Sequence, residues 1–323
     1  MADRLPAFLL VLAAGLLAHD SAAEPFVTRN QNPLVAPFGL PSPLPARLPA
    51  AGCGRVSLVS DWGNMAAIEG PEDNLVVDAE TAELRLTYER AIGRRFAARL
   101  SLPWRSTSGG SLDGVAESWH DLLGLPNGQR DFLPRDQVQI RYVSGDDVLL
   151  DVDRSTSGVG DVTLAGGYQL YDSDRSAVSA WLGVKLPSGD AGQLTGSGAT
   201  DVALSIAGQS APAPRWQLFG QVDAVLLGRG DLLPALQREF AWSALAGVAW
   251  SAWRGLDLLV QLQSNSAVFD ASETGLSGSA TVLTFGGRYR TQRGWTFDVG
   301  FSEDVDVGAS PDFVIHLGIA RDF

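Results

Sequence analysis

Hydrophobic and polar residues alternate with a period of two along residues 313–323. Phe313, Ile315, Leu317 and Ile319 fall on one face, small and polar residues fall on the other, and Phe323 closes the apolar face. Successive side chains of a β-strand point to opposite faces of the sheet, so this pattern predicts a strand with one apolar face. Such a strand with a terminal aromatic residue is typical of bacterial outer-membrane β-barrels.

The same alternation recurs in eleven earlier segments. They cover residues 56–62, 82–88, 96–104, 162–170, 178–186, 202–206, 216–226, 242–250, 256–262, 283–289 and 295–301. We therefore predict an all-β fold, a transmembrane antiparallel β-barrel of 12 strands, an even number as in single-chain bacterial barrels. The alternative is 14 strands, because residues 138–143 and 148–152 resemble a hairpin. Each is shorter than the roughly 9–11 residues of a membrane-crossing strand, so we place this hairpin outside the membrane as an extension of the sheet.

The connections between these strands alternate in length. The longer ones are residues 63–75, 105–159, 187–198, 228–238, 269–277 and 304–311. Bacterial barrels have short periplasmic turns and longer extracellular loops, so this asymmetry fits the predicted fold. Tryptophan and tyrosine also gather near both ends of the strands, as at Trp216 and Trp104. Amphipathic rings favour the two membrane interfaces, and this distribution supports a membrane-spanning wall.

The first residues predict export. Arg4 precedes an apolar run at 7–18, and Ser21-Ala22-Ala23 offers a small-residue cleavage site, so we interpret 1–23 as a signal peptide. Residues 24–54 contain seven prolines and have no periodicity. We expect an extended segment there, in the periplasm or entering the barrel lumen, because proline cannot donate to a sheet ladder. The barrel occupies 55–323, and its expected location is the outer membrane of a Gram-negative bacterium.

The composition limits the kinds of partner that this chain is expected to bind. The formal net charge is −13, from 24 basic and 37 acidic residues, and no basic patch is interleaved with aromatic residues, which disfavours nucleic-acid binding. Cys53 is the only cysteine, so no intramolecular disulfide is possible. The expected partners are outer-membrane lipids and lipopolysaccharide, the barrel-assembly machinery through the strand that ends at Phe323, and an unidentified small-molecule solute.

Charged and polar residues on the inward faces are the candidate lumen lining. They are Glu83, Arg85, Arg99, Lys185, Asp201, Asp223, Arg288 and His316. A barrel of twelve strands encloses more space than an eight-stranded one, whose interior side chains can fill it. The charges either cross-link into a plug or line a narrow polar path, and the sequence leaves both open. An unpaired charge in a dry lumen is costly, so pairs between adjacent strands, such as Glu83 with Arg99, are expected.

The longest loop has the most individual sequence. Leu112, Val115, Trp119, Leu122 and Leu123 recur at helical spacing, which predicts a short amphipathic helix over 111–123 that acts as a lid or lies at the membrane surface. The candidate functional residues of this loop are Gly109, Gly110, Asp113, Trp119, His120, Asp121, Arg130 and Asp131.

Several runs resemble known families. Pro103-Trp104, the Gly-Gly-x-Leu-Asp run at 109–113, the stretch from Trp119-His120 to Gly124-Leu125-Pro126 and the pair Arg130-Asp131 together resemble the Gram-negative outer-membrane family catalogued as domain of unknown function 3187. That resemblance covers most of the mature chain and implies a barrel but no activity. The runs at 158–161 and 185–190 resemble a broader group, which includes phenol-degradation-pathway barrels and long-chain fatty-acid transporters.

The function that we expect is passive transport of a small molecule, with an apolar one among the candidates, and with residues 105–136 controlling entry. A structural or surface-interaction barrel is the first alternative, and an outer-membrane hydrolase is the second. Nucleophilic catalysis would need a serine, a histidine base and an orienting group within hydrogen-bond reach. The mature chain offers only His120 and His316. Ser118 and Asp121 are close to His120 in the sequence, but only positions i, i+3 and i, i+4 share a helix face, so we expect no enzyme. No cysteine–histidine cluster or EF-hand spacing is present, so no cofactor or metal is expected.

Overall fold

The computed structural model describes residues 24–70, 75–110, 112, 114, 133–270, 278–305 and 309–323. Twelve of its strands form the wall of a barrel. They are β1 (Gly54–Glu69), β2 (Leu75–Ile92), β3 (Phe96–Ser108), β7 (Thr163–Asp172), β8 (Ser176–Lys185), β9 (Asp201–Ala213), β10 (Trp216–Leu226), β11 (Phe240–Trp253), β12 (Leu256–Asn265), β13 (Ala280–Arg290), β14 (Trp295–Asp304) and β15 (Phe313–Asp322).

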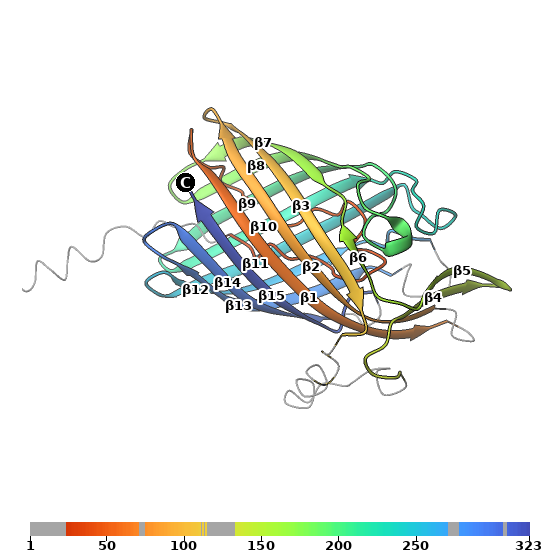
Figure 1. Ribbon diagram of the computed structural model, residues 1–323. Helices are drawn as coiled ribbons and strands as arrows, with labels where there is room; N and C mark the ends of the chain where they lie inside the picture. Colours follow the sequence, from red (N-terminus) through yellow and green to blue (C-terminus); the bar gives the residue numbers. More distant parts are fainter. Residues whose placement is uncertain are drawn as a thin grey trace, which may run out of the picture.

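The wall is a closed antiparallel barrel (Figure 1). Each wall strand pairs with the next one in this order, and β3 pairs directly with β7. β15 returns to pair with β1, from Asp322 opposite Arg55 to Phe313 opposite Asn64. Closure removes the free edges that an open sheet would expose. The prediction of an antiparallel barrel with a twelve-stranded wall is confirmed.

Neighbouring residues of a wall strand differ sharply in exposure, as the period-two pattern predicts. On β9, Leu204 is 54% exposed, whereas Ser205 is 1% exposed. Outward side chains of adjacent strands form an apolar belt, in which Leu86 of β2 lies between Leu58 of β1 and Leu102 of β3. Soluble proteins bury their large apolar side chains instead, so this distribution suits a wall surrounded by lipid.

The two ends of the barrel differ. Short turns join β2 to β3, β7 to β8, β9 to β10, β11 to β12 and β13 to β14 at one end, which we call the short-turn end. Gly93, Gly255 and Gly294 adopt positive φ in three of these turns, where glycine has no steric cost. Gly54 and Phe323 exchange two backbone hydrogen bonds of 2.8 and 2.9 Å, so the wall begins and ends there. We call the opposite end the long-loop end.

Three further strands lie beyond the wall. β4 (Gln139–Ser144) and β5 (Asp147–Val152) form a hairpin that pairs with the first residues of β2, and β6 (Thr156–Val159) pairs with the last residues of β3. The hairpin expected at 138–152 is therefore an extension of the sheet outside the closed wall. The described residues also include a 3₁₀ helix, η2 (Ala191–Gln193). Among those residues, no helix has the length and apolarity that a transmembrane helix needs.

Two loop boundaries were predicted wrongly. β1 continues to Glu69 and β3 to Ser108, so the loops at 63–75 and 105–159 begin later than expected. Residues 63–67 are buried at every position, which means that both faces of this part of β1 are covered. A strand covered on both faces need not alternate, and the pattern therefore hid it. The helix predicted over 111–123 lies almost entirely outside the described residues.

An arginine scan of the outer surface tests the lipid-facing belt. We expect Leu86→Arg to lower the free energy of unfolding in lipid vesicles by about 2–4 kcal/mol, because arginine at the midplane must leave water. Ile92→Arg on the same strand is the matched control, since Ile92 adjoins the turn after β2 and an interfacial arginine costs roughly 0–1 kcal/mol. Urea unfolding followed by tryptophan fluorescence measures both. Equal losses at the two positions would contradict the belt.

Candidate functional site

The interior of the barrel is occupied by residues 24–49, which we call the lumen segment. The sequence left two locations open for this part of the chain, and the structure has it inside the wall, where the red-to-orange trace runs (Figure 1). Phe26, Leu34 and Phe38 have no exposed surface. Its many prolines prevent a regular ladder with the wall, so its backbone groups need other partners.

Three inward glutamines on three wall strands supply some of those partners. The Oε1 atoms of Gln261 on β12, Gln221 on β10 and Gln169 on β7 accept from the backbone N–H groups of Phe26, Leu44 and Leu48, at 2.8, 2.7 and 2.7 Å. Gln261 and Gln169 also donate through Nε2 to carbonyl oxygens of the segment. A primary amide carries both donors and an acceptor, so it can replace the peptide group of a neighbouring strand.

Cationic and hydroxyl side chains of the wall donate hydrogen bonds to the backbone carbonyl groups of the lumen segment. Arg288 donates to the carbonyls of Glu24 and Pro25 at 2.6 and 3.2 Å, and Ser179 donates to that of Pro45 at 2.7 Å. Both termini of the segment lie toward the short-turn end, since Glu24 pairs with Arg55 at the start of β1 and Arg47 donates to Ser173 in the turn after β7. The middle of the segment therefore reaches into the barrel and returns.

An apolar cluster covers that middle part. Leu34 and Phe38 pack with side chains from the wall and the connections of the long-loop end, including Ile140, Leu232 and Phe269. The Phe38 and Phe269 rings meet edge to face, with centroids 5.2 Å apart. The lumen segment thus packs against apolar side chains toward the long-loop end and is held by polar contacts along its length.

Glu83 of β2 is the centre of the first charged cluster. Arg105 of β3 donates to it at 2.7 Å and Arg29 of the lumen segment at 3.2 Å, and Arg85 is a third partner. The expected pair between Glu83 and Arg99 is wrong, because the register of β2 and β3 sets Glu83 opposite Arg105. Arg99 instead lies opposite Glu89 and donates to it at 3.1 Å.

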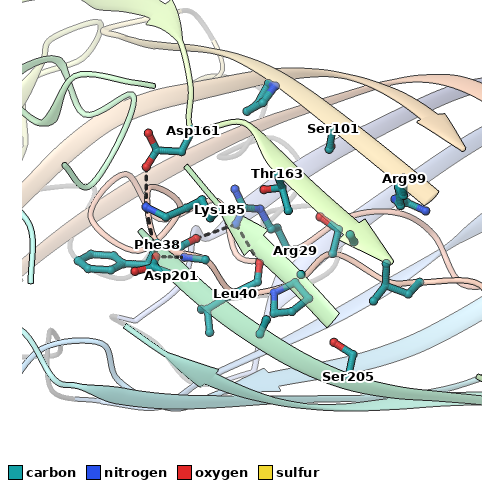
Figure 2. A pocket seen from close by; sticks show the side chains of 18 of the residues that line it. Arg29, Phe38, Leu40, Arg99, Ser101, Asp161, Thr163, Lys185, Asp201 and Ser205 are labelled. Atoms are coloured by element: carbon teal, nitrogen blue, oxygen red, sulfur yellow. Dashed lines mark hydrogen bonds and ion pairs between the residues drawn. The ribbon is translucent and has the colours of Figure 1, made fainter. Parts of the chain in front are cut away.

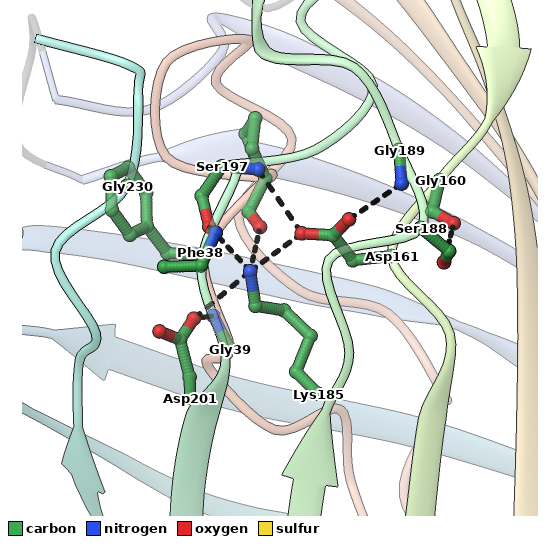
Figure 3. Close-up of polar contacts among 12 residues, drawn as sticks. Phe38, Gly39, Gly160, Asp161, Lys185, Ser188, Gly189, Ser197, Asp201 and Gly230 are labelled. Atoms are coloured by element: carbon green, nitrogen blue, oxygen red, sulfur yellow. Dashed lines mark hydrogen bonds and ion pairs between the residues drawn. The ribbon is translucent and has the colours of Figure 1, made fainter.

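Lys185 of β8 is the centre of the second cluster (Figure 3). Its Nζ lies 2.5 Å from Asp161 and 3.1 Å from Asp201, and it donates to the carbonyl of Pro37 at 3.2 Å. Asp201 in turn accepts from the N–H of Gly39 at 2.8 Å. A Cβ on Gly39 would lie 2.6 Å from that of Asp201, so glycine is what permits this close approach. Lys185 and Asp201 together hold the middle of the segment.

The other lumen candidates also point inward and have partners. Arg288 donates twice to Asp298 of β14, at 2.7 and 2.6 Å, and Asp223 accepts from Ser243 of β11. His316 of β15 contacts Asp61 of β1 through Nδ1, at 2.6 Å. Its Nε2 is buried and has no partner among the described residues.

All eight lumen candidates thus lie inside the barrel, but most of the loop candidates lie outside the described residues. Gly109 and Gly110 follow β3, whereas Asp113, Trp119, His120, Asp121, Arg130 and Asp131 lie outside the described residues. The sequence reading missed partners that prove central, namely Asp61, Glu89, Arg105, Asp161 and Asp298. Arg105 could have been found by continuing the alternation of β3 by two residues beyond Pro103. Nothing in the described residues groups three or more histidine, cysteine, aspartate or glutamate side chains as a metal site.

Among the described residues, the lumen segment and the wall enclose cavities, two of which concern us. The larger, of about 80 Å³, is bordered by β2, β3, β7, β8 and β9 (Figure 2). The smaller, of about 50 Å³, lies nearer the short-turn end, beside Glu24, Arg55 and Arg288. Both have the lumen segment as part of their lining, so moving the segment would enlarge both.

Comparisons with known proteins agree with this architecture. The family model described as "Protein of unknown function (DUF3187)" matches residues 4–323, and no curated protein matches the sequence. The fold is similar to the COG4313 outer membrane channel from Pseudomonas putida F1, with a TM-score of 0.58 and 15% identity over 86% of this chain and 97% of that chain. The NanC porin has a TM-score of 0.46 and 9% identity, over 81% of this chain and 98% of that one. The CymD monoaromatic hydrocarbon channel has 0.42 and 9%, over 93% and 94%. At 15% identity the likeness to the COG4313 channel concerns the fold alone.

A glutamine substitution tests the attachment of the lumen segment. We expect Gln261→Leu to lower the free energy of unfolding by about 1–3 kcal/mol, because it leaves the buried N–H of Phe26 without its acceptor. The same change should speed cleavage within residues 24–30 by an added protease. Gln263→Leu is the matched control, since Gln263 is two residues further on β12 and has no hydrogen bond to the described part of the segment. Identical behaviour of the two variants would contradict the attachment.

Proposed function

This chain belongs to the DUF3187 family, and we propose that it is a passive diffusion channel for small molecules in the outer membrane of Gram-negative bacteria. The observation that carries the proposal is the closed twelve-stranded barrel whose interior is occupied by residues 24–49 of its own chain. The proposed path opens when the lumen segment moves away from the wall.

The attachment of the segment is suited to release. Its contacts with the wall are hydrogen bonds, ion pairs and apolar packing, and its covalent link is the exposed stretch at residues 50–53. Both its termini lie toward the short-turn end, so it can leave there without threading past a loop. Water would replace the lost partners, and a hydrogen bond exchanged with water contributes only about 0.5–1.5 kcal/mol. Release would also expose the buried apolar side chains of the segment, such as Phe26, Leu34 and Phe38, but it would break no covalent bond and leave the strand pairing of the wall intact.

Control of entry is assigned to the lumen segment in this proposal. The sequence pointed to residues 105–136 for this role, but Arg105 to Ser108 are part of β3, and most of the remainder is not described. Residues 34–40, in contrast, pack into the apolar cluster at the long-loop end and cover the lumen there. Any solute that crosses must pass them.

The surroundings of the barrel follow from its outer surface. The apolar belt would contact outer-membrane lipids, and the longer loops would face lipopolysaccharide. Phe323 is half exposed, and its ring stacks near Tyr88 at the short-turn end, with centroids 6.1 Å apart. We propose that the strand ending there is the part that the barrel-assembly machinery recognises during insertion.

The two alternatives have less support. A structural or surface-interaction barrel is favoured by the many contacts that hold the segment closed, and the experiment below separates it from a channel. For a hydrolase, the candidate base from the sequence is His120, which lies outside the described residues, and the other histidine of residues 24–323 is His316. Its Nδ1 contacts Asp61, but Nε2, the atom that would activate a nucleophile, has no partner among the described residues.

A disulfide that locks the lumen segment tests the channel directly. A Cβ on Gly63 would lie 3.4 Å from the Cβ of Gln31, close to the roughly 3.5–4.5 Å that a disulfide spans. We therefore expect Gln31→Cys with Gly63→Cys, in a Cys53→Ser background, to form a disulfide between the segment and β1. Liposome swelling should show slow uptake of a small sugar when this pair is oxidised, and several-fold faster uptake after reduction.

Single-cysteine variants at positions 31 and 63 provide the controls, and their uptake should not change with reduction. Uptake that is equally fast with the pair oxidised would show that the segment does not gate the path. No uptake in either state would favour the structural barrel.

A further inference from the structure

The larger cavity has an unusual set of charges on its wall. Arg85 on β2 and Arg105 on β3 line it. Figure 2 shows Arg99 of β3, Arg29 of the lumen segment and Lys185 of β8 beside the same cavity. The side chains of Arg85 and Arg105 are 5% and 8% exposed, and that of Arg29 is 10% exposed. These cations are thus withdrawn from bulk water on a surface that encloses an empty space.

The carboxylates nearby do not balance these cations. Arg29, Arg85 and Arg105 share the single carboxylate of Glu83, which leaves two positive charges over in that cluster. Glu89 neutralises Arg99, while Lys185 has Asp161 and Asp201. Around the cavity as a whole, five cations therefore face four carboxylates. Arginine does not deprotonate in proteins, so the excess cannot be relieved by losing a proton.

One donor atom also lacks a partner. The Nε of Arg29 is buried and has no hydrogen bond to any described residue. The rest of its guanidinium donates to the carbonyls of Ala36, Phe38 and Leu40 and to Glu83. A buried cation with a free donor is costly unless an acceptor is supplied. Both the excess charge and the free donor call for an anion.

The remainder of the lining is apolar. Leu40 and Leu44 of the lumen segment, Trp181 of β8 and Ala203 of β9 border the same cavity. An inorganic anion would leave this surface unused, whereas a carboxylate with a short hydrocarbon group would contact both kinds of surface. The size sets a limit, because a cavity of about 150 Å³ accommodates benzene and this one has about 80 Å³.

We propose that this cavity binds a small monocarboxylate of two to four carbons. Its carboxylate accepts hydrogen bonds from the Arg29, Arg85 and Arg105 cluster, and its hydrocarbon group lies against Leu44 and Trp181. The proposal deepens the proposed function by naming a class of ligand that regulates the closed state, and as an account of regulation it rests on that function. Because Arg29 belongs to the segment and the other arginines to the wall, a bound acid joins the two and stabilises the closed arrangement.

Calorimetric titration of the detergent-solubilised mature protein tests this site, in a buffer without other small anions. We expect saturable binding of propionate, a rise in unfolding temperature with propionate, and neither effect with propionamide, which has the same shape but no charge. Arg105→Gln should weaken propionate binding at least tenfold. The matched control is Arg290→Gln, which removes a luminal arginine that pairs with Asp257 and lines neither cavity, and it should change the affinity less than twofold.

A second variant gives an independent readout if Arg105→Gln does not fold. Ser101 lines the cavity beside Arg99, so Ser101→Asp supplies an internal carboxylate. We expect this variant to lose propionate binding and to unfold at a higher temperature than the native protein, the reverse of what an added buried carboxylate usually does. A lower unfolding temperature together with unchanged propionate binding would overturn the assignment.

Three other outcomes would also overturn it. The first is equal affinity for propionate and propionamide. The second is displacement of propionate by chloride at the same concentration as by a second carboxylate. The third is an equal loss of propionate affinity in Arg105→Gln and Arg290→Gln. None of these results concerns uptake. A protein that passes the locked-segment experiment but fails here is a channel without this site, and one that binds propionate but shows no uptake has the site without the channel.

Discussion

The structure inside the barrel depends on one constraint, which is that the buried peptide N–H and C=O groups of residues 24–49 need hydrogen-bond partners. These residues are enclosed by the wall and rich in proline, so they form neither a strand nor a helix, yet buried N–H and C=O groups must be hydrogen-bonded. The wall meets that need with side chains. Gln169, Gln221 and Gln261 replace the peptide groups of a neighbouring strand. Arg288 and Lys185 donate hydrogen bonds to carbonyl oxygens of the segment. The inward faces of the wall strands are therefore polar for a structural reason.

This constraint also explains why the lumen charges do not form an open polar path. Glu83, Asp201 and Arg288 each contact both a wall partner and the lumen segment. The two possibilities that the sequence left open, a cross-linked plug and a lined path, are thus two states of one arrangement in our proposal. When the segment lies in the lumen, it completes the network of charged side chains. When the segment leaves, the same side chains would line a hydrated passage.

The wall could be predicted from the sequence because its physics is local. Lipid outside and polar groups inside impose a period of two on every crossing strand, and twelve such segments were visible. The same reasoning assigned eight lumen candidates to inward-facing positions of these strands. It could not give the register between strands, which decides that Glu83 faces Arg105 and not Arg99. Register is a property of two segments together, and side-chain alternation within one strand does not contain it.

The path of the lumen segment could not be predicted for a different reason, and the sequence left its location open between the periplasm and the lumen. Its residues have no periodicity, because each is positioned by a different wall strand, as Phe26 is by β12 and Leu48 is by β7. The Glu83 cluster was likewise incomplete without Arg29, which comes from that segment, and without Arg105, which had been assigned to a loop. Contacts between residues more than fifty positions apart, made by irregular backbone, leave no local pattern to detect.

The most direct test of the account is single-channel conductance in planar bilayers, comparing residues 24–323, the expected mature protein, with a refolded chain that begins at residue 50. The account predicts a mature barrel that is closed for most of the recording and a shortened barrel that is open steadily, with larger current steps. Steps of the same size and frequency in both would show that residues 24–49 do not occupy the conducting path, and the account would be wrong.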